Sequence, residues 1–308
     1  MTLKVDKSGH TKIRCGSILV NDLDVSLALY RDVLEQDVVE SGELNNKLAE
    51  SWGAPRLSGA KTCLLQPRSG AQSYLRLIQS PDKVTPVAHA TTYGWCAYEI
   101  CVSDVFALAE SLEGTDFKVV GPPKRMDNIA NVIPMQVVGP DQEVLFLNQV
   151  LESDAHSDLP VAQCTVDQIF IAVLASNNRQ QTVANYVQEL AGDEAGTYEL
   201  RYSLINRAFG LDPEVTHKLT LVQDGRTPLL EIDQYPDMAG SRKHAEGNLS
   251  HGNTMVSLVV NNLDELPLSN KVSEQPIYSD GLLYAGGRSI VLRGDCGECL
   301  ELIELPKS

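Results

Sequence analysis

The sequence predicts an α+β protein built from four copies of one βαβββ unit, and two observations support this. First, four segments share the order of a short apolar strand, a polar turn and an amphipathic helix. They begin at Cys15, Ala97, Gln168 and Met255. Second, further strands follow each segment, and the last of them is recognisable in every copy, at 73–79, 143–150, 228–236 and 298–305. A strand, a helix and then strands, repeated along the chain, is typical of α+β architecture.

The spacing of the opening strands and the caps of the helices that follow them support the fourfold repeat. The strands end on valines spaced by 82, 71 and 87 residues, close to the length of one supersecondary unit. These are Val20, Val102, Val173 and Val260. Asp22, Asn262 and the pair Ser103–Asp104 stand where a helix needs an N-cap. The predicted helix 22–34 carries apolar residues at helical spacing, so one face is buried.

Charge and composition narrow the functional classes. The formal net charge is −16 and no basic run is present, which disfavours nucleic acids and anionic membranes as partners. No apolar run approaches the roughly 18 residues of a membrane span, and the opening lacks a secretory apolar region, so we expect a cytoplasmic protein. Seven scattered cysteines do not form a disulfide framework. We interpret Cys296 and Cys299 as part of a turn before a strand rather than a zinc or redox site.

A polar segment divides the chain into two halves. Residues 151–163 contain Pro160 and join the second unit to the third. We therefore predict an N-terminal domain over 1–151 and a C-terminal domain over 163–308, each pairing its own two units. Because four units complete both domains, the fold requires no partner subunit, and a monomer and a homodimer both stay open.

Two motifs resemble a known family. The stretch VNDLDVSLALYRDVL resembles the opening, and GPDQEVLFL the final strand, of the vicinal oxygen chelate superfamily. Glyoxalases, bleomycin-resistance proteins and extradiol dioxygenases belong to this group. The resemblance implies that paired units form a curved mixed sheet around a cup. It also implies that the first residue of each opening strand and one residue of each closing strand supply the ligands of a divalent metal.

In the N-terminal half these positions hold no plausible metal site. They are Cys15, Arg76, Ala97 and Phe146. A guanidinium is a permanent cation, so we expect no metal there. Strand alternation places Ser17, Tyr74, Glu99 and Asn148 on the same face. We expect Arg76 to form a structural ion pair with Glu99, with an anion clamp as the alternative reading of Arg76.

In the C-terminal half the positions are Gln168, Glu231, Met255 and Glu301. Gln168, Glu231 and Glu301 match the ligands that the resemblance implies, whereas a thioether at Met255 is a poor ligand for hard ions. Whether this cup binds one divalent metal (Zn, Mn, Fe or Ni) therefore stays open. Without it, Glu231 and Glu301 are expected to act as acid and base groups, with Gln168 orienting the substrate. A degenerate site, with the carboxylates paired to arginine, is the other alternative.

Further residues are expected to line the C-terminal cup and contact a substrate. Strand alternation adds Phe170, Asp233, Ser257 and Ile303, and Tyr235 follows Asp233 on one face. Asn206 and Arg207 lie in 202–211, which we interpret as middle strands of the third unit. His251 lies in the polar loop 239–253, which either covers the cup or is a connector.

The expected function is that of a vicinal-oxygen-chelate-type enzyme. The C-terminal cup would act as a lyase or isomerase on a small carbonyl or aromatic compound, with Glu231 and Glu301 as catalytic residues. The alternative is a metal-free cup that sequesters a small molecule, as the bleomycin-resistance resemblance implies. A divergent ring-cleaving dioxygenase is disfavoured, because that chemistry needs two histidines and one carboxylate on iron, and no opening position holds a histidine.

Overall fold

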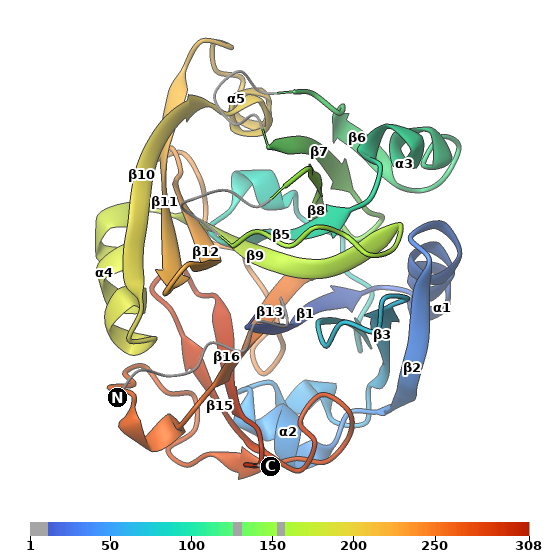
Figure 1. Ribbon diagram of the computed structural model, residues 1–308. Coiled ribbons are helices and arrows are strands. Elements are labelled where there is room, and N and C mark those ends of the chain that lie inside the picture. Colours follow the sequence, from blue (N-terminus) through green and yellow to red (C-terminus); the bar gives the residue numbers. More distant parts are fainter. Residues whose placement is uncertain (1–11, 126–130, 153–157, 308) are drawn as a thin grey trace.

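The structure is a computed structural model that describes residues 12–125, 131–152 and 158–307. It confirms the α+β class and four βαβββ modules (Figure 1). Module 1 comprises β1 (Ile13–Val20), α1 (Leu23–Ala28), β2 (Gln36–Glu43), β3 (Lys61–Pro67) and β4 (Tyr74–Gln79). Module 2 comprises β5 (Gly94–Val102), α3 (Val105–Ser111), β6 (Lys118–Gly121), β7 (Val132–Val138) and β8 (Val144–Val150). Within the described ranges, no helix is both long and apolar enough to cross a membrane.

The second half of the chain repeats this order with one variation, a short turn in place of the helix of module 4. Module 3 comprises β9 (Val166–Ser176), α4 (Arg179–Glu189), β10 (Asp193–Arg201), β11 (Thr216–Asp224) and β12 (Thr227–Gln234). Module 4 comprises β13 (Gly252–Val260), a 3-10 turn (Leu263–Glu265), β14 (Ile277–Tyr278), β15 (Arg288–Arg293) and β16 (Cys299–Glu304). The expected fourth helix is only this turn, because Pro267 follows it closely and cannot continue a helix.

The modules pair differently from the prediction. One eight-stranded sheet has the order β14-β15-β16-β13-β1-β4-β3-β2, and the other has the order β10-β11-β12-β9-β5-β8-β7-β6. Module 1 therefore pairs with module 4, and module 2 pairs with module 3, through the antiparallel contacts β1–β13 and β5–β9. The expected pairing within 1–151 and within 163–308 is wrong, because each sheet takes one module from each half. We call the concave faces of these sheets the 1–4 cup and the 2–3 cup.

The two cups face away from each other. One apolar cluster combines strand residues of both sheets with residues of α1, α3 and α4, so the sheets and these helices share a central core. Two separate clusters fill the opposite faces. The 1–4 cup is covered by α2 (Asn46–Ser51), and the 2–3 cup is covered by α5 (Ser203–Phe209), which lie at opposite ends of the molecule in Figure 1.

Tyr98 joins the backs of the two sheets. Its hydroxyl donates to the backbone carbonyls of Ser17 (2.6 Å) and Met255 (3.1 Å), which lie on neighbouring strands of the other sheet. Gly16 makes this approach possible, since a Cβ there would lie 2.7 Å from the Tyr98 ring. The glycine is thus required by a close approach rather than by its backbone torsions.

Two equivalent tyrosine–glutamate hydrogen bonds connect the two sheets, one in each half of the chain. Tyr30 of module 1 donates to Glu143 of module 2 (3.2 Å), and Tyr186 of module 3 donates to Glu298 of module 4 (2.6 Å). Both glutamates follow the turn before a closing strand, and both are buried. Burial and the nearby Asp141 raise the pKa of Glu143 to about 8, so this contact is made mainly by a protonated carboxyl group at neutral pH.

Candidate functional site

The pairing of modules redistributes the residues at the ligand positions that the sequence resemblance implies. Cys15, Arg76, Met255 and Glu301 meet in the 1–4 cup. Ala97, Phe146, Gln168 and Glu231 lie in the other sheet. Neither set expected from the sequence is assembled, and the proposed ligand trio of Gln168, Glu231 and Glu301 is divided between two sheets. Glu231 and Glu301 therefore do not share a cup.

The strand register also corrects the position of Gln168. Arg76 and Glu301 lie beside Ser17 and Ser257, each two residues after the opening position of its module. Glu231 lies beside Val173, so the equivalent opening position in module 3 is Ile171. The opening strand of module 3 continues through an apolar run to Ser176, and its helix is capped by Asn178. Val173 is thus not the end of that strand, and Gln168 lies three residues before the ligand position.

Arg76 and Glu301 form the polar floor of the 1–4 cup. Arg76 is 4% exposed and Glu301 is fully buried. Arg76 Nη2 lies 3.6 Å from Glu301 Oε2, Nε donates to Ser17 Oγ (3.0 Å), and Nη1 donates to Tyr284 Oη (3.0 Å). The guanidinium also stacks on Trp52, with Cζ 4.4 Å from the ring centroid. The two charges thus compensate each other inside a buried network.

Protein donors surround the Glu301 carboxylate. Oε1 accepts from Tyr284 Oη (2.9 Å), Trp52 Nε1 (3.2 Å) and Ser289 Oγ (3.3 Å), and Oε2 accepts from Ser257 Oγ (2.7 Å). With the ion pair to Arg76, these contacts occupy the carboxylate's acceptor capacity. This arrangement matches the alternative considered from the sequence, a degenerate site in which a carboxylate pairs with arginine. The partner of Arg76 is Glu301, however, and not Glu99 as expected.

The donor set of the 1–4 cup does not fit the metal that the resemblance implies. A guanidinium occupies one ligand position, a thioether another, and the single carboxylate is saturated by protein donors. Burial raises the pKa of the Cys15 thiol to about 11, which disfavours the thiolate that metals bind. Among the described residues, no group of three or more His, Cys, Asp and Glu side chains is placed to hold a metal ion.

The charge of Arg76 persists despite its burial. Burial by itself lowers the pKa of Arg76, but interactions with Tyr284, Cys15 and Glu301 outweigh it, and the pKa is raised above its ordinary value. Burial raises the pKa of Tyr284 well above its usual range, so its hydroxyl remains a donor to Glu301. The floor therefore keeps a permanent cation at Arg76, with the Tyr284 hydroxyl protonated beside it.

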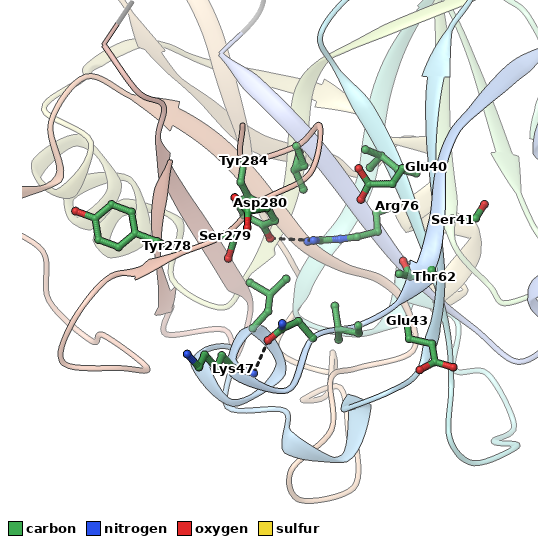
Figure 2. Close-up of a pocket in the computed structure, with 16 residues that line it drawn as sticks. Glu40, Ser41, Glu43, Lys47, Thr62, Arg76, Tyr278, Ser279, Asp280 and Tyr284 are labelled. Atoms are coloured by element: carbon green, nitrogen blue, oxygen red, sulfur yellow. Dashed lines mark hydrogen bonds between the residues drawn. The ribbon is translucent and has the colours of Figure 1, made fainter. Parts of the chain in front are cut away.

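A cavity of about 430 Å³ opens above this floor (Figure 2). Its inner wall is formed by the buried side chains of Leu44, Leu48, Leu64, Leu283, Arg76 and Tyr284. The outer wall comes from the edge strand β2 and from the loop between β14 and β15. Figure 2 shows Arg76 reaching across the cavity to Tyr284. The volume lies in the range of small-molecule sites, about 300–1,000 Å³.

The sequence placed Arg76 in a cup but did not indicate the residues that surround its guanidinium. Trp52 is the C-terminal cap of α2, and Tyr284 lies in the loop between β14 and β15, so neither belongs to a repeated strand position. Glu40 accepts the backbone N–H of Leu282 (2.9 Å), which fixes the loop against β2. The tryptophan and the tyrosine themselves were the sequence signal, since aromatic side chains bury large areas in cores and interfaces.

The 2–3 cup contains a group of acids. Glu99 and Asp233 are buried there, Glu231 is half-buried beside them, and Asn148 Nδ2 donates to Glu99 Oε2 (2.6 Å). Tyr202 donates to Glu231 (3.4 Å). Glu99 thus pairs with Asn148 instead of forming the expected bridge to Arg76.

Burial governs the protonation of these acids. It raises the pKa of Glu231 to about 7, and burial together with repulsion from Glu231 raises the pKa values of Glu99 and Asp233 well above their usual range. No arginine or lysine is among the main causes of these three pKa shifts. The group of three carboxyl groups therefore retains protons at neutral pH. Phe170, Phe146 and Tyr235 lie in the apolar cluster around them.

Several residues expected to contact substrate have structural contacts instead. Segment 203–209 is helix α5, not a strand. Asn206 Nδ2 donates to the carbonyls of Pro213 and Val215, and its Oδ1 contacts His217, while Arg207 donates to Val120 of module 2. These contacts hold α5 over the 2–3 cup.

The remaining predicted residues are distributed over both sheets. Tyr235 contacts Cys96 (3.0 Å), and Arg14 lies 5.0 Å above the Tyr74 ring. Met255 and Ser257 belong to the 1–4 cup. His251 lies outside both apolar cup clusters, with Nε2 3.6 Å from Asp141 Oδ1. Its loop is held by Arg242, which donates to the carbonyls of Trp95 and Asn253.

Solved structures share this architecture. Glyoxalase I from Zea mays superposes with a TM-score of 0.61 at 13% identity, over 95% of this chain and 92% of that chain. A Bacillus subtilis protein described as a dioxygenase superposes with a TM-score of 0.58 at 12% identity, over 97% of this chain and 87% of that one.

This protein has the vicinal oxygen chelate fold. The resemblance seen in the two sequence motifs is therefore confirmed at the level of the fold. No family model matches the sequence, and no curated protein matches it. At identities this low the likeness carries the fold alone, so function must be argued from the cups.

Proposed function

We propose that this protein binds a small organic molecule in the 1–4 cup without the divalent metal typical of the fold. One observation carries the proposal: the cavity of about 430 Å³ is lined by Arg76, which together with the fully buried Glu301 behind it occupies two of the ligand positions that the resemblance implies. The carboxylate that could bind a metal is saturated by protein donors. The apolar inner wall suits an aromatic or aliphatic ligand.

Arg76 supplies the polar recognition in this proposal. A guanidinium has five N–H donors, and the structure assigns two hydrogen bonds, from Nε and Nη1. Nη2 is buried and has no hydrogen-bond partner among the described residues, although it lies 3.6 Å from Glu301. The remaining donor capacity suits a carbonyl or other neutral acceptor oxygen. A second full anion is disfavoured, because Glu301 already neutralises the arginine.

Two measurements test this proposal. Elemental analysis of protein incubated with Zn, Mn, Fe or Ni and then desalted should find far less than one metal per chain, with no change in Glu301→Gln. A screen of small aromatic and carbonyl compounds by ligand-observed NMR should find binders that compete with one another. Thr62→Trp, at a half-buried position of the cavity wall, should abolish binding, whereas Thr115→Trp, at a half-buried position of the turn between α3 and β6, should not. Stoichiometric metal lost in Glu301→Gln contradicts the proposal.

The acids of the 2–3 cup favour a second candidate, an acid–base enzyme. The pKa of Glu231, at about 7, matches that of a group that exchanges protons near neutral pH. In this second candidate, the lyase or isomerase reaction expected from the sequence would use Glu231 and Asp233 as acid and base groups, in place of Glu231 and Glu301. Turnover of any carbonyl substrate that is lost in Glu231→Gln and kept in Thr62→Trp would favour this cup. Ring cleavage on iron is not proposed, because no ligand position of either cup holds a histidine.

A further inference from the structure

We propose that the ligand of the 1–4 cup is an organic amine that carries its cationic group at the mouth and a neutral acceptor oxygen at the floor. This inference rests on the proposed function and names the chemical class of its ligand. It follows from the different charge of the inner and outer parts of one cavity.

The floor favours a neutral acceptor. Arg76 and Glu301 form a compensated pair, and both are nearly or fully buried. A carboxylate or phosphate placed there would add an uncompensated negative charge beside Glu301 in a region that excludes water. A carbonyl or ether oxygen can use the spare donors of Arg76 without that cost. The apolar residues around the floor would then contact the carbon skeleton.

The mouth favours a cation. Glu40, Glu43 and Asp280 line the outer cavity, against a single ammonium group from Lys47. All four side chains are exposed, so the rim carries a net charge of −2 on formal counting. In the view of Figure 2, Glu40 and Asp280 lie on either side of the Arg76 guanidinium. A cation at the mouth therefore gains attraction from the rim, and an anion is repelled.

An aromatic side chain completes the mouth. Tyr278 belongs to the cavity lining and is 77% exposed, and in Figure 2 its ring extends outward from the mouth, away from Arg76. An ammonium group over such a ring gains a cation–π contact in addition to the charge attraction. Different residues would thus bind the acceptor oxygen and the cationic group of the ligand. Experiments can therefore test the two contacts separately.

Three matched probes separate them: 4-(aminomethyl)benzamide, 4-(hydroxymethyl)benzamide and 4-carboxybenzamide. They share the benzamide and differ in the group at the opposite ring position, which is cationic, neutral and anionic in turn. By isothermal titration calorimetry at low salt, the amine should bind about tenfold more tightly than the alcohol, and the acid should bind most weakly. Raising NaCl from about 0.05 to about 0.5 M should reduce this preference, because exposed charges are screened.

Variants assign the preference to the rim. Asp280→Asn and Glu40→Gln should each bring the affinity for the amine closer to that for the alcohol and leave the alcohol unchanged. Glutamine at position 40 keeps an acceptor for the Leu282 N–H, so the loop stays in place. Glu113→Gln, an exposed acid of module 2, is the control and should change nothing.

The outcomes distinguish the two proposals. If the three probes bind with equal affinity and Thr62→Trp abolishes all binding, the cavity binds ligands but the inference about the amine is wrong. If the acid binds most tightly, Arg76 acts as an anion clamp and the inference is also wrong. If no probe binds at millimolar concentration, neither this inference nor the acceptor chemistry proposed for the floor holds.

Discussion

Replacing Glu301 by glutamine should strongly destabilise the protein. The amide keeps the shape of the carboxylate, and its oxygen can still accept from Trp52 and Tyr284. Its NH₂ group, however, would stand where Oε2 now lies, 3.6 Å from Arg76 Nη2. A guanidinium that is 4% exposed would lose the only anion with which it forms an ion pair in the described chain. Removing one partner of a buried pair typically costs about 3–5 kcal/mol.

That cost is a large fraction of the stability of a typical protein, about 5–15 kcal/mol. Urea unfolding followed by circular dichroism at pH 7 measures it. The double variant Arg76→Met/Glu301→Gln removes both charges and should recover most of the loss, so the double-mutant cycle should show a coupling of about 2 kcal/mol or more. Asp82→Asn breaks the exposed pair with Arg56 and should cost less than about 1 kcal/mol.

A free energy of unfolding for Glu301→Gln within about 1 kcal/mol of the wild-type value would contradict a buried, compensated ion pair. So would a double variant that is no more stable than the single one. Either result would mean that Arg76 is not compensated by Glu301 and that the floor of the 1–4 cup is not the charge pair described above.

Three further perturbations test the fold around the cups. The pKa of Glu143 is raised from 4.5 to about 8 in the folded protein. Its contribution to the free energy of unfolding is therefore fully present below pH 4.5 and is lost as the pH rises through 8. Urea midpoints should fall over this interval, with less slope in Glu143→Gln. Trp52→Phe removes a donor to Glu301 and should cost about 1–2 kcal/mol in the same assay. Gly16→Ala places a methyl group against Tyr98 and should cost about 1–3 kcal/mol, whereas an unchanged midpoint would show that the sheets can separate there.

Local patterns predicted the modules well. The N-caps at Asp22, Asp104 and Asn262 accept backbone N–H groups as expected, because capping depends on a few neighbouring residues. The closing positions Arg76, Phe146, Glu231 and Glu301 also occupy equivalent places in the strand registers. The error at Gln168 came from the apolar run after Ile169, which does not show where a buried strand ends.

The candidate site was less predictable. Arg76 and Glu301 were both singled out, but in different cups, and the residues that complete their network lie outside the repeated strands. Trp52 and Tyr284 enter the cup from a short helix and a loop whose positions depend on the whole sheet. A loop side chain has no fixed period, so its contacts cannot be deduced from spacing.

The sequence by itself determined that this protein consists of four α+β modules, because strand period, helix period and caps are local properties of the chain. Only the tertiary structure decided which modules share a sheet. Each module offers a similar opening strand, so local patterns cannot distinguish pairing of module 1 with module 2 from pairing with module 4. That choice depends on contacts between distant residues, such as Tyr98 against Gly16 and the strand pairs β1–β13 and β5–β9. It places Arg76 beside Glu301 and thereby gives the 1–4 cup a charge pair at the positions that the family resemblance implies for a metal.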